Sequence, residues 1–177
     1  MKEQVILVDE RNNELGFMEK MDAHREGRLH RAISVFIFND NHELLLQKRA
    51  DHKYHSGGLW TNTCCTHPRP GESTLEASNR RLFEEMGLKS DLKLVHQFTY
   101  CTPFDNGLTE NEYDHVYIGF TDHTPILNPD EASDYKYVNL DDLSLMIKEN
   151  PDEYTSWFKI CFKEVKSIVL KLLNNNR

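Results

Sequence analysis

The sequence predicts an α+β fold in which a mixed sheet is packed between helices. Several short apolar runs bounded by turn residues have the length and composition of strands. Two stretches with apolar residues three and four positions apart are typical of amphipathic helices. Strands and helices do not alternate strictly, which argues against a purely parallel sheet. Because no repeat or linker interrupts the 177 residues, we expect one domain spanning residues 1–177.

The first quarter of the chain is rich in predicted strands. Residues 5–8 and 15–18 are apolar runs on either side of an asparagine turn, which indicates a hairpin. Residues 20–27 are polar and are expected to form a short helical turn or a loop. Residues 30–38 are almost continuously apolar, as in a central strand buried on both faces. Residues 43–49 are expected to fold back on it as the second arm of a hairpin.

A polar loop and a capped helix follow. Residues 51–58 are polar and end in two glycines, so we expect a loop. Ser73 followed by Glu76 forms a capping box, which predicts that a helix begins there. Gly87 is expected to end this helix in the left-handed conformation. The inner stripe predicted for the helix is Leu75, Leu82 and Met86.

The second half of the chain predicts three more strands and two helices. The strands are expected at 92–100, 113–121 and 135–139, and a helix is expected at 140–148, before Pro151. A long amphipathic helix is predicted at the C-terminal end, where apolar residues recur with helical spacing. These residues are Phe158, Cys161, Phe162, Val165, Ile168, Val169 and Leu172.

Composition and charge narrow the class of protein. Hydrophobic residues make up 38% and charged residues 28%, which is typical of a globular chain. The net charge of −8 argues against a nucleic-acid partner, and an anionic substrate would need local cations or bound metal. No apolar run reaches the roughly 18 residues of a membrane span, and no secretory signal is recognised. We therefore expect a cytoplasmic protein with four reduced thiols.

Two pairs of candidate ligands share one spacing. Cys65 and His67 are two residues apart in a stretch expected to be extended, and so are Glu110 and Glu112. Residues i and i+2 of an extended chain point to the same side, so each pair can converge on one point. Carboxylates and imidazoles together suit a divalent metal. Two further histidines could add imidazoles: His24 and His30.

These residues also have purely structural interpretations. Cys65 and His67 could be half of a structural zinc site, although a second Cys-x-x-Cys pair is missing. Glu110 and Glu112 could be ordinary loop charge. The remaining histidines are interpreted as structural or solvated side chains: His42, His52, His55, His96, His115 and His123.

The charged residues near the end of the predicted 73–87 helix allow two interpretations. Arg80 and Arg81 can form ion pairs one turn along the helix with Glu84 and Glu85, each worth about 0.2–0.5 kcal/mol. Alternatively, one of the two glutamates binds a metal and one of the two arginines binds a phosphate, for which guanidinium is the preferred partner. Local spacing does not decide between them.

Residues 66–88 resemble a Nudix box, the loop–helix–loop motif G-x5-E-x7-R-E-U-x-E-E-x-G-U, in which U is a bulky aliphatic residue. The matching positions are Glu72, Arg80, Leu82, Glu84, Glu85, Gly87 and Leu88. Thr66 replaces the first glycine, and Arg81 replaces the glutamate after the arginine. In Nudix pyrophosphohydrolases, helix carboxylates gather magnesium and help to activate water. An arginine there favours holding a diphosphate over cleaving it, and the implied fold is a Nudix-like α/β/α sandwich.

These departures, and the sequence ahead of the box, resemble one branch of that superfamily, the type I isopentenyl-diphosphate isomerases. The shared features are the TNTCCTHP segment at 61–68, Glu72 after it, the ENE triplet at 110–112, His24 and His30 ahead of the first long strand, and Trp157. The resemblance extends from Lys20 to at least Trp157. It implies interconversion of isopentenyl diphosphate and dimethylallyl diphosphate, precursors of isoprenoids, by an allylic 1,3 proton shift through a tertiary carbocation.

The resemblance also assigns ligands. It implies that one divalent metal, Mn²⁺, Mg²⁺ or Zn²⁺, is bound by His24, His30, His67, Glu110 and Glu112. It implies that Glu85 helps to hold a Mg²⁺ ion that bridges the substrate diphosphate. The diphosphate-binding cations that it implies are Lys20, Arg49, Lys53 and Arg81. Local cations and metal would then offset the acidic chain.

Four residues are implied to carry out the chemistry. Glu112, polarised by the metal and hydrogen-bonded to Tyr100, delivers a proton to the terminal carbon. Cys65 removes a proton from C2 as thiolate on the opposite face, whereas Cys64 points away from the site. Trp157 lies over the cation, where an indole face is the best aromatic partner, and keeps water out.

Two rival interpretations stay open at the level of sequence. One is a Nudix hydrolase of a nucleoside diphosphate derivative, which would need the water activation that Arg81 hinders. The other is a non-catalytic zinc-binding interaction domain, which leaves Tyr100 and Trp157 without a purpose. We expect an isomerase whose partner is a small diphosphate, without nucleic acid or membrane, and which is a monomer or a weak homodimer.

Overall fold

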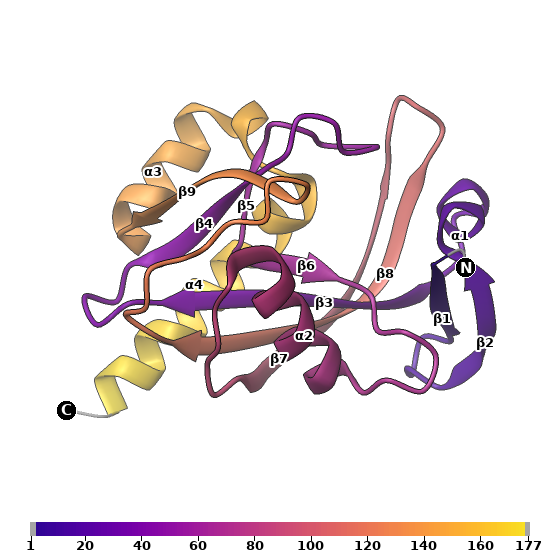
Figure 1. Ribbon diagram of the computed structural model, residues 1–177, viewed down its shortest axis with the longest axis horizontal. Coiled ribbons are helices and arrows are strands. Elements are labelled where there is room, and N and C mark those ends of the chain that lie inside the picture. Colours follow the sequence, from indigo (N-terminus) through magenta and orange to yellow (C-terminus); the bar gives the residue numbers. More distant parts are fainter. Residues whose placement is uncertain (1–2, 176–177) are drawn as a thin grey trace.

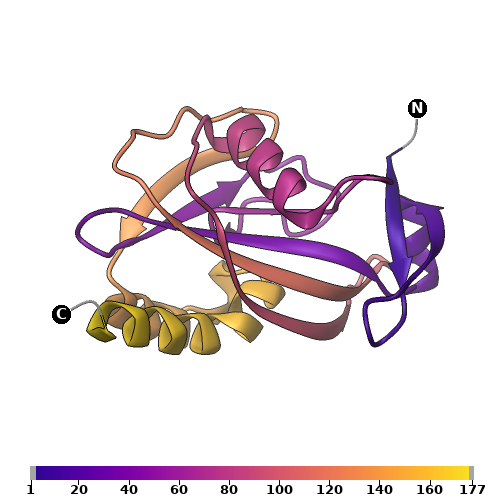
Figure 2. The same cartoon turned by 90° about the horizontal axis from the view of Figure 1, so that it is seen from below.

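A computed structural model describes residues 3–175, in which nine strands form one sheet with helices on both faces (Figures 1 and 2). The strands are β1 (Gln4–Val8), β2 (Glu14–Glu19), β3 (His30–Phe38), β4 (Leu44–Arg49), β5 (Trp60–Thr61), β6 (Cys64–Thr66), β7 (Lys93–Pro103), β8 (Thr109–Phe120) and β9 (Ala132–Val138). The helices are α1 (Lys20–Glu26), α2 (Thr74–Met86), α3 (Leu140–Glu149) and α4 (Ser156–Asn175), with a 3-10 turn η1 (Pro151–Glu153). The predicted α+β sandwich is confirmed.

The sheet is organised around β3, which has different partners on its two edges. On one edge it runs parallel to β8 over its full length, from the His30–Glu112 pair to the Phe38–Phe120 pair. On the other edge the short strand β6 pairs with it antiparallel. The prediction that β3 and β4 pair along their length as a hairpin is therefore wrong. The two strands pair only at Phe38 and Leu44, and β4 pairs along its length with β9, because β6 takes up the edge of β3 that β4 would need.

The two faces of β3 pack into two separate hydrophobic cores. Alternate side chains point to opposite faces of a strand, so Ile33 and Val35 pack under α2 while Phe36 packs against α4. All three are at most 1% exposed. The prediction of a strand buried on both faces is confirmed. Figure 2 shows the consequence, with α2 above the sheet and α4 below it.

Helix α2 has the boundaries that the sequence predicts. Ser73 and Glu76 form the reciprocal capping box, and Gly87 ends the helix at φ 65°. A Cβ at Gly87 would lie 2.8 Å from the Cβ of Ile126, so glycine is also required by close packing. The predicted inner stripe is wrong at Leu75, which is 44% exposed, because the buried face begins only at Ala77.

Two local elements bring the N-terminal part of the chain to the end of β3. Residues 20–26, expected as a helical turn or a loop, form the short helix α1, which leads directly from β2. The β7–β8 hairpin extends beside it (Figure 1). Among residues 3–175, no helix is both long and apolar enough to cross a membrane.

Candidate active site

A cavity of about 250 Å³ lies where β3, β6 and β8 come together. Every residue that the sequence assigned to the site lines this cavity, apart from His24 and His30. Those two histidines are fully buried, and their ligand atoms lie within 4.8 Å of those of His67 and Glu112, which do line it. The fold therefore gathers residues that are up to 137 positions apart, from Lys20 to Trp157.

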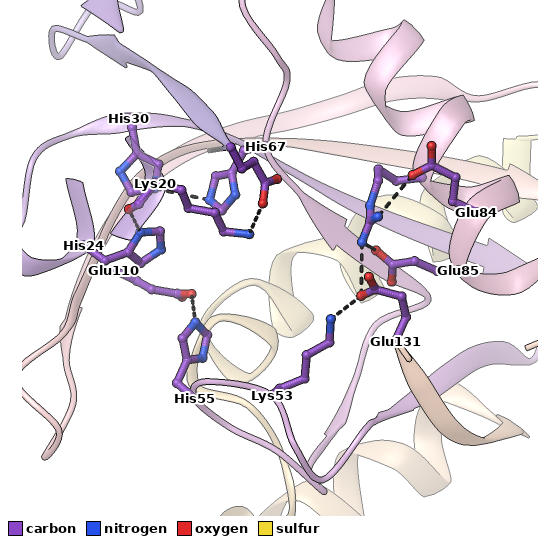
Figure 3. A network of polar contacts seen from close by, with 12 residues as sticks. Lys20, His24, His30, Lys53, His55, His67, Glu84, Glu85, Glu110 and Glu131 are labelled. Atoms are coloured by element: carbon purple, nitrogen blue, oxygen red, sulfur yellow. Dashed lines mark hydrogen bonds and ion pairs between the residues drawn. The ribbon is translucent and has the colours of Figure 1, made fainter. Parts of the chain in front are cut away.

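Four potential metal ligands form one buried cluster: His24, His30, His67 and Glu112. The parallel pairing of β3 with β8 sets His30 opposite Glu112. His67, which follows β6, lies 2.8 Å through Nε2 from Oε1 of Glu112 and 3.2 Å from Nε2 of His30. Figure 3 shows the three imidazoles turned toward one another. Imidazole nitrogens that converge in this way can hold one cation between them.

The outer nitrogens of this cluster are fixed by the backbone. Nδ1 of His24 lies 2.7 Å from the carbonyl oxygen of Lys20, and Nδ1 of His30 lies 2.7 Å from that of Arg28. A carbonyl only accepts, so each Nδ1 donates and leaves Nε2 as the ligand atom. Nε2 of His24 has no hydrogen-bond partner among the described residues. Burial lowers the pKa of His67 to about 3, which favours the neutral form that binds metals.

Glu110 and Glu112 are joined by Tyr100. Its hydroxyl lies 2.8 Å from Oε2 of Glu110 and 2.6 Å from Oε2 of Glu112, so the predicted bond to Glu112 is confirmed. The strand spacing places both carboxylates on the cavity side of β8, as the i, i+2 pattern predicts. Ordinary loop charge is therefore the wrong interpretation, because both side chains are buried.

His55 is a residue of the site that the sequence interpretation missed. It was expected to be structural or solvated, but it lines the cavity and its side chain is 3% exposed. Its Nε2 lies 3.0 Å from Oε1 of Glu110 (Figure 3). His24, His55 and Glu110 form a second group of potential metal ligands. The polar loop 51–58 offers no periodicity that could predict where such a side chain points.

Cys65 and Cys64 face opposite sides of β6. Cys64 is fully buried in the core under α2, whereas Cys65 faces the cavity, as predicted. The Cys65 thiol donates to Oδ1 of Asn62 at 3.0 Å and accepts from the indole N–H of Trp157 at 3.0 Å. Burial raises the pKa of Cys65 to about 12, so its thiol is protonated in the free protein, and its action as a thiolate stays a prediction.

Trp157 contacts Cys65 and Arg49 at the wall of the cavity. Its indole points an edge at the Cys65 sulfur, and the guanidinium carbon of Arg49 lies 5.2 Å from the ring centroid. One partner of this indole is therefore a protein cation. The predicted role of Trp157 in closing the pocket stays a prediction.

A buried carboxyl behind Cys65 was also missed. Ser34 donates a hydrogen bond to Oδ2 of Asp114 at 2.7 Å, and its hydroxyl lies 3.8 Å from the sulfur of Cys65. Burial, with a smaller contribution from the charge of Glu112, raises the pKa of Asp114 to about 8. The signal was present in the sequence, because Asp114 continues the two-residue spacing of Glu110 and Glu112.

The predicted diphosphate-binding cations line the cavity, and three of them are paired with carboxylates. Lys20 pairs with Glu3 at 3.2 Å, and Lys53 pairs with Glu131. Arg81 lies between Glu85 at 2.6 Å and the same Glu131 at 3.1 Å. The fourth cation is Arg49, which donates to the backbone oxygen of His55 at 3.3 Å. Glu131 was not predicted and has no motif around it.

The ion-pair interpretation of the charged end of α2 is confirmed, and the metal and phosphate interpretation stays a prediction. The two ion pairs between neighbouring turns are present, at 3.2 Å for Arg80 with Glu84 and 2.6 Å for Arg81 with Glu85. Arg80 also binds Glu72 through two nitrogens, at 2.6 and 2.8 Å, which fixes the loop before the helix. Only Arg81 and Glu85 reach the cavity.

The sheet between helices, with a helix that presents charged residues to a cavity of potential metal ligands, defines the class of a Nudix domain. A model of the NUDIX domain family matches residues 28–158, so the chain belongs to this family. Two solved structures share the fold. One is DR0079 from Deinococcus radiodurans, with TM-score 0.70, 24% identity and coverage of 83% of this chain and 90% of that one. The other is a MutT protein from Methanosarcina mazei, with TM-score 0.65, 19% identity and coverage of 78% and 94%.

More similar relatives define the branch. A protein of Aromatoleum aromaticum named isopentenyl-diphosphate Delta-isomerase 2 is 52% identical over 94% of this chain and 88% of its own length. One of the same name from Photorhabdus laumondii is 54% identical over 90% of each. Within the Nudix superfamily, the chain belongs to the type I isopentenyl-diphosphate Delta-isomerases.

Proposed function

We propose that this enzyme interconverts isopentenyl diphosphate and dimethylallyl diphosphate by an allylic 1,3 proton shift. The observation that carries the proposal is that one cavity holds two proton-transfer side chains, Cys65 and Glu112, between a cluster of potential metal ligands and a group of cations. Relatives that are 52–54% identical and named for this isomerisation support it. The reaction supplies both precursors of isoprenoids.

The diphosphate is proposed to bind among Lys20, Arg49, Lys53 and Arg81. Glu85 is proposed to help hold a Mg²⁺ ion that bridges the diphosphate, since its carboxylate lines the cavity and is fixed by Gln47 at 2.9 Å. The present partners of the cations, Glu3 and Glu131, keep them from lying unpaired in the free protein. Local cations in this way hold an anion within a chain of net charge −8.

A second divalent ion is proposed at the buried cluster. The donor set of imidazoles and carboxylates suits Mn²⁺, Mg²⁺ or Zn²⁺, and the unpartnered Nε2 of His24 lies where it can coordinate. The ligands proposed from the family are His24, His30, His67, Glu110 and Glu112. When bound, the ion supplies positive charge beside Glu112, which strengthens its carboxyl group as an acid.

The proton transfers are proposed to use the two opposite groups in turn. The Glu112 carboxyl, oriented by Tyr100, gives its proton to the terminal carbon of the alkene, so that a C–H bond forms and a tertiary carbocation remains. The Cys65 thiolate then takes a proton from C2, and the electrons of the broken C–H bond form the new double bond. The reverse reaction exchanges the roles.

The free protein corresponds to the state after both transfers. Cys65 then carries a proton; burial alone would raise the pKa of Glu112, but the adjacent imidazoles of His30 and His67 hold it well below its usual range. We propose that, before the next turnover, Cys65 releases its proton to solvent and Glu112 takes up a proton from solvent. The N–H of Trp157, which points at the sulfur, stabilises the thiolate that this exchange requires.

The cavity walls are proposed to protect the cation from water. Trp157 and Tyr100 are at most 8% exposed, and they form the cavity wall next to Cys65 and Glu112. Exclusion of water prevents addition of hydroxide to the cation, which would give an alcohol. Arg81, in place of the Nudix glutamate, pairs with Glu84 and Glu85 and so withdraws them from activating water for hydrolysis.

Isomerisation in heavy water tests the proposal directly. With isopentenyl diphosphate as substrate, we expect deuterium in the methyl groups of the dimethylallyl product and at C2 of recovered substrate, measured by NMR. Both positions exchange because Glu112 and Cys65 take their hydrogen from solvent between turnovers. Release of phosphate without any deuterium in the carbon chain would instead identify a hydrolase.

Removal of metal is expected to abolish activity reversibly. Incubation with a chelator followed by desalting should leave the fold intact, because the hydrophobic cores lie outside the cluster. Addition of Mn²⁺, Mg²⁺ or Zn²⁺ one at a time should restore turnover and identify which ion serves. Full activity of a preparation verified as metal-free by elemental analysis would contradict the metal site.

The assembly and place of action are proposed from the sequence. We propose that one domain of residues 1–177 acts as a monomer or weak homodimer on a small diphosphate in the cytoplasm, where thiols remain reduced. The four cysteines are unpaired in the structure. The net charge of −8 supports the absence of a nucleic-acid partner, and no membrane partner is proposed.

A further inference from the structure

The loop between β4 and β5 is held in a tight, closed shape. The amide of Gly58 donates to the carbonyl of Arg49 at 3.0 Å, which closes the ends of the loop. A Cβ on Gly57 would lie 2.4 Å from the carbonyl oxygen of Asp51, so only glycine permits this close approach. Asn106, in the β7–β8 turn, donates to the carbonyl of Tyr54 at 3.1 Å. The loop therefore presents its side chains in fixed positions.

Two aromatic contacts fix the ring of His55, in addition to its contact with Ser56. It stacks on Phe104 with centroids 4.8 Å apart and planes 12° apart, and it meets Trp157 edge-on at 5.7 Å. Nδ1 lies 3.3 Å from the hydroxyl of Ser56. The other ring nitrogen, Nε2, thus points into the cavity beside Glu110.

The contact between His55 and Glu110 is close without being an aligned hydrogen bond. Nε2 lies 3.0 Å from Oε1 of Glu110, yet it has no hydrogen-bond partner of acceptable geometry among residues 3–175. Nε2 of His24 is unpartnered in the same way, and the three ligand atoms lie within 4.8 Å of one another. The imidazole and the carboxylate are both buried and lie 3.0 Å apart, but they are not aligned for a hydrogen bond. This is the arrangement of two ligands of one ion.

The shortest spacings within the two groups match the edge of an octahedral site. Neighbouring ligands that lie about 2.1 Å from an octahedral ion are about 3.0 Å from one another. His67 and Glu112 are at 2.8 Å, His30 and His67 at 3.2 Å, and His55 and Glu110 at 3.0 Å. The six ligand atoms form two groups that share His24, so one ion would draw the pair from the loop and the other three residues together around it.

We propose that His55 is a further ligand of the buried metal, through Nε2, and completes a set of four imidazoles and two carboxylates. The inference rests on the metal site of the proposed function and adds a ligand from a different part of the chain. It also gives the loop a role, because Lys53 lies two residues earlier and Arg49 binds the carbonyl of His55. Metal binding then fixes two of the diphosphate-binding cations.

The test is to count the nitrogen ligands of the metal. Mn²⁺-loaded protein labelled with ¹⁵N-histidine is measured by pulsed EPR, together with Mn²⁺ affinity in competition with a chelator. We expect four coupled imidazoles in the wild type and three in His55→Phe, which keeps the stacking on Phe104 and lacks nitrogen. We expect the affinity of this variant to fall by about 10–100-fold. Hydrogen exchange at 51–58 should slow on Mn²⁺ addition only in the wild type.

Matched variants separate the explanations. His52→Ala removes an exposed histidine from the same loop and should bind Mn²⁺ like the wild type. His55→Ala leaves room for free imidazole, which should restore affinity, whereas His55→Phe should not respond. Three coupled imidazoles in both wild type and His55→Phe would overturn the proposal, and so would unchanged affinity. Failure of the wild type to bind Mn²⁺ at all would instead reject the metal site of the proposed function.

Discussion

Replacement of Cys65 by alanine is expected to lower isomerisation by about 10³-fold, whereas Cys64→Ala should retain most of it. The two thiols are adjacent in sequence but point to opposite faces of β6. Only Cys65 reaches the cavity, where Asn62 and Trp157 hold its sulfur at 3.0 Å each. Without that sulfur, the wall loses the group that is proposed to take the proton from C2.

The measurement is deuterium incorporation into the diphosphates in heavy water, which follows both proton positions. Cys65→Ala should bind substrate with nearly unchanged affinity, because the diphosphate is held by other residues. Cys64 is fully buried under α2, so Cys64→Ala should cost stability, about 1 kcal/mol, in a thermal unfolding experiment. Equal loss of exchange in both variants would reject the assignment of Cys65.

Glu112→Gln is expected to remove both the proton transfer and the metal. Isomerisation should fall by about 10³-fold, because an amide cannot deliver the proton, and metal affinity should fall by more than about 100-fold. The reason is the central position of Glu112, which lies 2.8 Å from His67, 3.5 Å from His30 and 2.6 Å from Tyr100. Affinity by chelator competition and turnover in heavy water measure the two losses separately.

Tyr100→Phe provides the matched control for Glu112. It removes the hydroxyl that binds both carboxylates and leaves every proposed ligand in place. We expect turnover to fall by about 10–100-fold while metal affinity stays within about tenfold of the wild type. If Glu112→Gln kept its metal and its turnover, Glu112 would be neither ligand nor acid, and the mechanism would have to use another carboxyl group such as Asp114.

Local signals predicted most of the elements. The capping box at Ser73 and the left-handed Gly87 set the ends of α2, since both depend on backbone groups within a few residues. The apolar run at 30–38 predicted a strand buried on both faces, which is its actual environment. The pairing of the strands with one another was less predictable. Strand β4 pairs mainly with β9, about 90 residues later, and no residue near β4 carries that information.

The candidate site was predicted unevenly for the same reason. The members of each predicted pair are two residues apart in extended chain and face the same side, so the spacing sufficed to group them. The pairs are Cys65 with His67 and Glu110 with Glu112. Asp114 follows the same spacing and could have been included. Glu131 and His55 lie on loops, where direction is set by contacts with distant residues such as Arg81 and Phe104. The protonated state of Cys65 follows from its burial, which only the packed structure determines.

By itself, the sequence determined which side chains of the TNTCCTHP segment and the ENE triplet share a face, and how the helix beside them begins and ends. These are properties of the local backbone, with periods of two and 3.6 residues. The tertiary structure alone decided what those faces meet. Parallel pairing of β3 with β8 sets His30 opposite Glu112, and the loop after β4 brings His55 against Glu110. Distances across a cavity depend on the whole fold, because residues far apart in the chain meet only when both of their elements are packed.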